Sequence, residues 1–124
     1  MKGDKRGTYL FIFHLRGDLK VKTRGGKTFY LPRGVYIYVG SAFGGGGIPK
    51  RVGRHLKRNK PLRWHLDYIT TSEEFEFIGV IPFWGKKVEC KLAGLLRKIP
   101  KTEPIKGFGC SDCKCESHLF RLKK

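Results

Sequence analysis

The segment GVYIYVGSAFGGGGIPK, residues 34–50, carries the clearest fold signal in this chain. Its first half alternates with a period of two residues, which predicts a strand over residues 35–40. Tyr36, Tyr38 and Gly40 then share one face of the strand, and the aliphatic residues between them share the other. The glycine run that follows predicts a loop, and the proline after it is suited to the first turn of a helix.

The segments on either side of this stretch predict an α+β domain. The other expected elements are strands over residues 8–15 and 75–83, a hairpin of strands 19–23 and 28–31, helices over 49–58, 61–70 and 87–99, and a terminal strand within HLFRL. Residues 8–15 are mostly apolar and aromatic, so we expect this strand to be central and buried on both faces. The irregular alternation of strands and helices indicates a small mixed sheet with helices beside it.

Composition narrows the class of partner. The 124 residues, about the length of one domain, carry 27 Lys+Arg against 10 Asp+Glu, a formal charge of +17. A 40% hydrophobic content is enough for a core, and no apolar run is long enough to span a bilayer or to act as a signal peptide. We therefore expect a cytoplasmic protein whose partner is a polyanion, DNA or RNA, and no membrane contact. One asparagine and no glutamine suggest a thermophilic source.

Glu89 is the first candidate for chemistry. On the expected helix 87–99 it falls inside the apolar arc formed by Val88, Leu92, Ala93, Leu95, Leu96 and Ile99. A carboxylate directed toward a core face is costly unless a cation or donor meets it. The alternative is a first-turn glutamate that favours the helix N-terminus and bends out to water.

The helix after the glycine run supplies basic candidates. Its expected buried stripe consists of Ile48, Val52 and Leu56. Arg51 and His55 lie four residues apart on the flank of that stripe, where an arginine can direct two hydrogen bonds at a phosphate. The outward-facing basic residues are expected to be solvated or to contact nucleic-acid phosphates: Lys50, Arg54, Lys57 and Arg58.

The C-terminal region concentrates soft metal ligands. Cys110, Cys113, Cys115 and His118 fall within nine residues, while Cys90 stands apart. Four such ligands could hold a structural zinc ion, but the segment is short and no second CxxC pair accompanies it. A disulfide and plain thiols packed near a site are the alternatives.

Five short motifs occur in a characteristic order: Gly7-Thr8-Tyr9, Tyr38-Val39-Gly40, Ser41, Arg51-x-x-x-His55 and Glu89-Cys90-Lys91-Leu92. Together they resemble the motifs of the GIY-YIG nuclease superfamily. The longer segments GVYIYVGSAFGGGG, RVGRHL, WHLDY, VECKLA and GFGCSDCKCESHLF are similar to a prokaryotic and archaeal branch of it, over nearly the whole chain. Thr8 and Val39 replace the two isoleucines, and the extra hairpin lengthens the gap between the tyrosines. For WHLDY, a core tryptophan with a local His–Asp hydrogen bond is the simpler interpretation.

This resemblance implies metal-dependent DNA cleavage on a small, mainly antiparallel sheet flanked by helices. Glu89 would be the single protein ligand of Mg²⁺ or Mn²⁺, which keeps several waters and takes few carboxylates. Tyr9 would be the general base, its pKa lowered by surrounding positive charge, and Arg51 would hold the scissile phosphate. Tyr38 and His55 would orient water and phosphate, with Ser41 among the nucleic-acid contacts. The alternatives are a non-catalytic nucleic-acid-binding module of the same fold and a zinc-stabilised RNA-binding protein.

Overall fold

The computed structural model describes residues 5–109, 115 and 117–123. In chain order the elements are β1 (Gly7–Leu15), β2 (Leu19–Lys22), β3 (Thr28–Leu31), β4 (Gly34–Ala42), α1 (Gly47–Leu56), α2 (His65–Thr70), β5 (Phe75–Trp84), α3 (Glu89–Arg97), β6 (Thr102–Pro104) and β7 (Leu119–Leu122). The expected α+β class is confirmed. The short strand β6 was not anticipated from the sequence.

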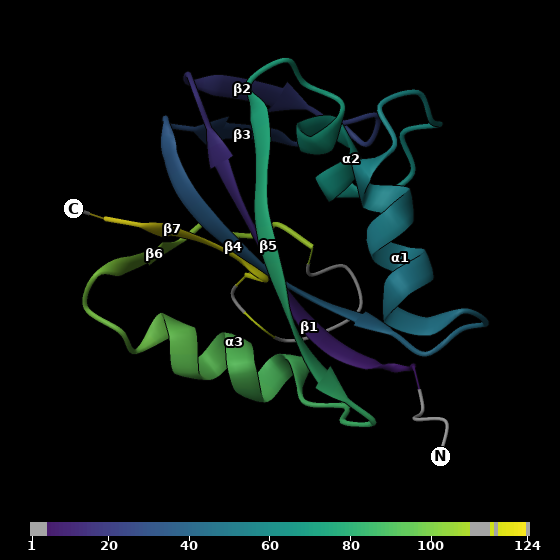
Figure 1. Ribbon diagram of the computed structural model, residues 1–124. Helices are drawn as coiled ribbons and strands as arrows, with labels where there is room; N and C mark the ends of the chain where they lie inside the picture. The colour runs from purple at the N-terminus through teal and green to yellow at the C-terminus, as the bar shows by residue number, and fades with distance from the viewer. Residues whose placement is uncertain (1–4, 110–114, 116, 124) are drawn as a thin grey trace.

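The main sheet has five strands in the order β5-β1-β4-β7-β6, and β2 and β3 form a separate two-stranded sheet. Every strand pair in these sheets is antiparallel. The mainly antiparallel sheet implied by the resemblance is confirmed, and the mixed sheet expected from the alternation of elements is wrong. The strands that helices connect, β4 to β5 and β5 to β6, run parallel to each other but are not neighbours, because other strands lie between them. Figure 1 shows α1 and α2 on one side of the sheet and α3 across the other.

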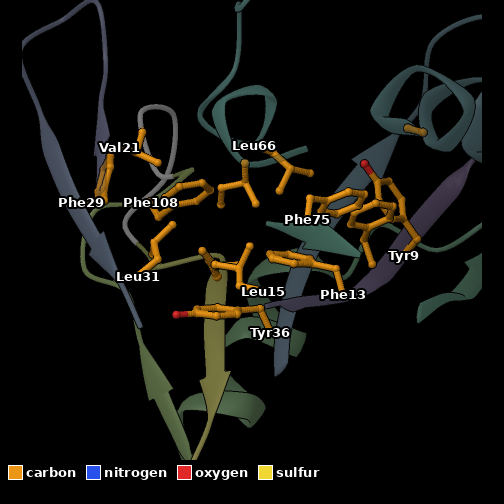
Figure 2. Close-up of a cluster of buried hydrophobic side chains, with 14 of the residues drawn as sticks. Tyr9, Phe13, Leu15, Val21, Phe29, Leu31, Tyr36, Leu66, Phe75 and Phe108 are labelled. Atoms are coloured by element: carbon orange, nitrogen blue, oxygen red, sulfur yellow. The ribbon is translucent and has the colours of Figure 1, made fainter. Parts of the chain in front are cut away.

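The face of the sheet toward α1 and α2 holds the larger core. Alternate residues of β1 point into it, and Phe11, Phe13 and Leu15 are fully buried there. Phe13 stacks on Tyr36 of β4 at a ring-centroid distance of 5.4 Å. Figure 2 shows that this cluster continues into the β2–β3 hairpin through Val21, Phe29 and Leu31, with Tyr9 at the opposite end. The hairpin thus belongs to the core of the domain.

The opposite face, under α3, is less completely covered. Val39, Ala93 and Phe120 form its buried cluster, while Leu10, Ile12 and His14 of β1 are only half-buried. The expectation that β1 is buried on both faces is therefore only half right. Among the described residues, α3 is the one helix that covers this face. Its apolar arc is narrower than expected, since Leu95 is 52% exposed and Ile99 lies beyond the helix end.

In the described part of the chain, no helix combines the length and the apolar character needed to cross a membrane.

Candidate functional site

A cleft of about 700 Å³ opens where the N-terminal end of β1 and the C-terminal half of β4 meet α1 and the start of α3. Its lining includes all five residues predicted to be catalytic and one predicted nucleic-acid contact: Tyr9, Tyr38, Arg51, His55, Glu89 and Ser41. They come from β1, β4, α1 and α3; β4 and α1 are consecutive in the chain, whereas β1 and α3 are distant from both and from each other. The convergence therefore results from the fold and not from sequence proximity.

Strand pairing brings the two tyrosines to one face. Tyr9 of β1 lies directly opposite Gly40 of β4, and Phe11 lies opposite Tyr38. Tyr9 and Tyr38 are therefore diagonal neighbours on the same side of the sheet, as expected if the strands pair. The tyrosine rings occupy the space above Gly40, since an added Cβ there would lie 2.5 Å from the Tyr9 hydroxyl and 3.0 Å from Tyr38 Cε2.

Gly40→Ala is therefore expected to destabilise the fold by about 1–3 kcal/mol, the usual cost of overpacking a filled core. Tyr9 cannot swing away cheaply, because its buried hydroxyl is hydrogen-bonded. Gly53→Ala, on the exposed side of α1 with nothing within 4 Å of the new Cβ, is the matched control and is expected to stabilise by about 0.5–1 kcal/mol. Urea unfolding of both variants checks the prediction, and equal stabilities would contradict it.

Helix α1 presents His55 and Arg51 to the cleft. The helix begins at Gly47, whose φ of +60° permits the sharp turn out of the glycine run, and ends at Leu56. The buried stripe differs from the expected one: His55 is 1% exposed, whereas Leu56 is 39% exposed. The helix is rotated so that the imidazole packs on the sheet, where its Nε2 lies 2.6 Å from the Tyr9 hydroxyl.

Arg51 is fixed on the wall of the cleft by two contacts. Its guanidinium donates a hydrogen bond to the Ser41 carbonyl oxygen at 3.0 Å and lies over the Trp64 ring, 4.6 Å from the centroid. Trp64 is 38% exposed, so the expectation of a core tryptophan is wrong. The indole instead supports Arg51, as well as Arg54 at 4.2 Å.

Burial determines the protonation of the Tyr9–His55 pair. It raises the pKa of Tyr9 above its usual value, and the nearby Arg51 guanidinium opposes the rise without overcoming it. The expectation of a lowered tyrosine pKa is therefore not met, because desolvation of the phenolate outweighs the positive charge. Burial, together with the positive charge of Lys60 and Arg51, lowers the pKa of His55 to about 3. At neutral pH the pair is a phenol beside a neutral imidazole.

Arg54 belongs to a buried network and does not point freely to solvent. Its guanidinium donates two hydrogen bonds to the Asp67 carboxylate, at 2.7 and 3.1 Å, and Asp67 has no exposed side-chain area. The Asp67 carboxylate also accepts hydrogen bonds from the backbone N–H groups of Arg63 and Trp64. Burial alone would raise the pKa of Asp67, but these donors lower it. Arg54 thus connects α1 to α2 and does not line the cleft described above.

Lys60 belongs to the same network. Its ammonium donates to the carbonyl oxygens of Arg54 and His55 at the end of α1, and to the Thr70 hydroxyl. Burial lowers the pKa of Lys60 to about 8, and Asp67, 3.8 Å away, opposes this shift. These bonds satisfy carbonyl groups that a helix end leaves without partners.

The other predicted nucleic-acid contacts lie outside the cleft. Lys50, Lys57 and Arg58 are exposed on or just after α1. The lining also includes residues that were not predicted to act in the site, among them Phe43, Arg63 and Lys87. Arg63 directly precedes the WHLDY segment and Lys87 directly precedes the VECKLA segment, which is the signal that could have identified them.

The WHLDY segment also contributes His65, but not in the expected way. Its Nδ1 accepts a hydrogen bond from the Gly109 backbone N–H at 3.0 Å, while the Asp67 carboxylate is engaged by Arg54. The expected local His–Asp hydrogen bond is therefore wrong. Burial lowers the pKa of His65 and of His118, so both imidazoles favour the neutral form.

Glu89 is the first residue of α3 and is half-buried in the cleft wall. Among the described lining residues it is the one carboxylate, and the same lining includes the cations Arg51, Arg63 and Lys87. Its charge acts on the Tyr9 phenol and on the His118 imidazole. One carboxylate beside open space fits Mg²⁺ or Mn²⁺, which binds through one or two carboxylates while phosphate and water supply the other ligands.

Residues 8–124 match a protein family described as "Domain of unknown function DUF123". The chain belongs to the DUF123 family. No curated protein and no solved structure matches the chain. Every residue that lines the cleft falls within the residues that match the DUF123 family.

Proposed function

We propose that this DUF123 domain is a metal-dependent DNA endonuclease with weak sequence specificity, as its resemblance to the GIY-YIG nucleases implies. The observation that carries the proposal is the composition of the cleft: one carboxylate, one braced arginine and a buried tyrosine–histidine pair. A phosphodiester needs a cation to neutralise its charge and a base to activate water. RNA is the alternative substrate. The cytoplasmic location and the thermophilic source stay predictions from the sequence.

Arg51 is the residue best placed to hold the scissile phosphate. Its contacts with the Ser41 carbonyl and the Trp64 ring orient the guanidinium before substrate binds. A donor fixed in advance stabilises negative charge developing on phosphate without a further cost of reorganisation. The exposed Lys50, Lys57 and Arg58, and Lys87 at the cleft, would attract the DNA backbone without reading its sequence.

The Tyr9–His55 pair would take the proton of the attacking water. Because the Tyr9 phenol is protonated, it can accept that proton only by passing its own to His55 Nε2, 2.6 Å away. The low pKa of His55 opposes this transfer in the unliganded protein. Substrate phosphate adds negative charge to the cleft, which favours the imidazolium. The resulting hydroxide attacks phosphorus, and the P–O bond to the leaving oxygen breaks.

Glu89 would hold a divalent cation, Mg²⁺ or Mn²⁺. The ion would act as a Lewis acid that stabilises charge on the leaving oxygen. Tyr38, beside Tyr9 on the same face, would help to position the water.

Arg51→Met tests the proposal. With supercoiled plasmid and Mg²⁺ or Mn²⁺, we expect cleavage by the wild-type protein and a loss of about 10²–10³-fold in the variant, as for other fixed donors to transition-state charge. Lys50→Met is the matched control: it removes an equal charge from the neighbouring, exposed position outside the cleft. Equal cleavage by the two variants would contradict the assignment of Arg51.

A non-catalytic nucleic-acid-binding module is the second candidate, favoured by exposed aromatic side chains at the cleft. Phe43 and Trp64 are both 38% exposed there, beside Arg63 and Lys87. Aromatic faces beside cations are typical of proteins that stack single-stranded bases. This function predicts salt-dependent binding by the wild-type protein without cleavage of plasmid, branched or single-stranded DNA.

A further inference from the structure

Two cysteines and a histidine from separate parts of the chain meet beside the start of α3. Cys90 is the second residue of α3, Cys115 precedes β7, and His118 is the residue just before β7. One ligand atom from each side chain lies within 4.8 Å of the other two. His118 is buried, Cys115 is partly buried and Cys90 is exposed. The sequence had placed Cys90 apart from the other candidate ligands.

The spacing of these atoms is close to that of a tetrahedral zinc site. Zinc binds thiolate sulfur at about 2.3 Å and imidazole nitrogen at about 2.0 Å, so neighbouring ligand atoms lie about 3.5–3.8 Å apart. Atoms no more than 4.8 Å apart share a centre at most about 2.8 Å from each of them. Small side-chain rotations would therefore bring all three to bonding distance.

The backbone holds at least two of these residues in place independently of any ion. The backbone N–H of His118 donates to the Phe108 carbonyl, at 3.0 Å, and its carbonyl accepts from the Val39 N–H at 2.8 Å. Cys115 packs against the buried cluster under α3. Cys90 follows Glu89 in the first turn of α3, where its position is set by the helix. The ligands are thus presented from a preformed framework.

We propose that Cys90, Cys115 and His118 bind one zinc ion. Both thiols would bind as thiolates and release their protons to solvent, while the imidazole would bind through a neutral nitrogen. A disulfide would use only the two sulfur atoms and leave the convergence of His118 unexplained. Cys110 and Cys113, predicted as further ligands, lie outside the described residues.

This site is separate in chemistry from the hard-cation site proposed at Glu89. Sulfur and nitrogen ligands select zinc, whereas a single carboxylate with water and phosphate suits magnesium or manganese. Zinc would join the first turn of α3 to the segment before β7, two parts of the chain that are distant in sequence. Because Glu89 is adjacent to Cys90, the same bond would fix the orientation of the Glu89 backbone at the cleft.

The test measures zinc and does not depend on nuclease activity. The full chain, purified without a histidine tag and dialysed after exposure to zinc, is expected to retain about one zinc ion per chain by elemental analysis. Replacing zinc with cobalt is expected to give a thiolate-to-cobalt charge-transfer band. Cys90→Ser and His118→Gln are expected to lose both signals. The control His14→Gln, at a half-buried position on β1 away from the three ligands, is expected to keep them.

Three results would overturn the proposal: no retained zinc in the wild-type protein, unchanged zinc in Cys90→Ser, or a Cys90–Cys115 disulfide found by mass spectrometry of the native protein. Zinc lost from Cys113→Ser but kept by Cys90→Ser would place the ion on the C-terminal segment alone. Cys90 is exposed, so its serine variant is expected to fold, which circular dichroism checks. Absence of cleavage with zinc bound would contradict the nuclease proposal and leave the zinc site intact.

Discussion

Glu89→Gln is expected to reduce metal-dependent cleavage by about a thousandfold or more. A Lewis acid at the leaving oxygen contributes several kcal/mol of transition-state stabilisation, and each 1.36 kcal/mol corresponds to a tenfold change in rate. Glutamine keeps the shape of the side chain at this half-buried position but lacks the charge that holds a divalent cation. No other carboxylate among the described lining residues could replace it. Plasmid cleavage as a function of Mg²⁺ and Mn²⁺ concentration measures the effect.

Glu103→Gln is the matched control for charge. Glu103 lies on β6, is half-exposed, and approaches Arg121 at 3.8 Å, outside the cleft. We expect the Glu103→Gln variant to cleave DNA at the wild-type rate and with the wild-type metal requirement. If Glu89→Gln cleaved like Glu103→Gln at all metal concentrations, the cation would have to bind elsewhere, and the catalytic role of this cleft would be wrong.

The two central strands could be predicted from the sequence because their pattern is repeated and local. In β4, a period of two residues separates Tyr36 and Tyr38 from Val39, and the structure places these residues in the two clusters on opposite faces of the sheet. The same rule places Tyr9 beside Tyr38 once β1 pairs with β4. Motifs in the correct order on such strands were enough to select the residues that meet in the cleft.

Side-chain contacts could not be predicted in the same way. The helical period places His55 and Leu56 next to each other at the edge of the expected buried stripe. Leu56 is the more hydrophobic of the two, so it was predicted to be the buried residue. The hydrogen bond between His55 and Tyr9 joins residues 46 positions apart, so no local sequence pattern predicts it. Arg54 was likewise predicted to be exposed. Its carboxylate partner, Asp67, lies on another helix, so the periodicity of α1 gives no sign of this ion pair.

Asp67→Asn is expected to lower the free energy of unfolding by about 3 kcal/mol, near the lower end for breaking a buried ion pair. Its carboxylate, fully buried, accepts two hydrogen bonds from Arg54 and two from backbone N–H groups. An asparagine oxygen can keep part of this pattern but leaves the Arg54 guanidinium without its counter-charge. A shift of roughly 10 °C in melting temperature corresponds to this loss. The control Asp18→Asn, at an exposed turn, is expected to change stability by less than about 0.5 kcal/mol.

Asp67 also makes the stability of the fold depend on pH. Its hydrogen bonds from Arg54 and the backbone lower the pKa of Asp67 below the ordinary value of 3.8. As the pH falls, Asp67 therefore takes up a proton in the unfolded chain at a higher pH than in the folded chain. The stabilisation by the charged carboxylate is complete above about pH 4 and is lost as the pH falls through the folded pKa. Urea unfolding at pH 7, 5 and 3 should show a fall for the wild-type protein that is smaller in Asp67→Asn. Identical pH profiles for the two proteins would mean that the Asp67 carboxylate is not held in its charged form by Arg54.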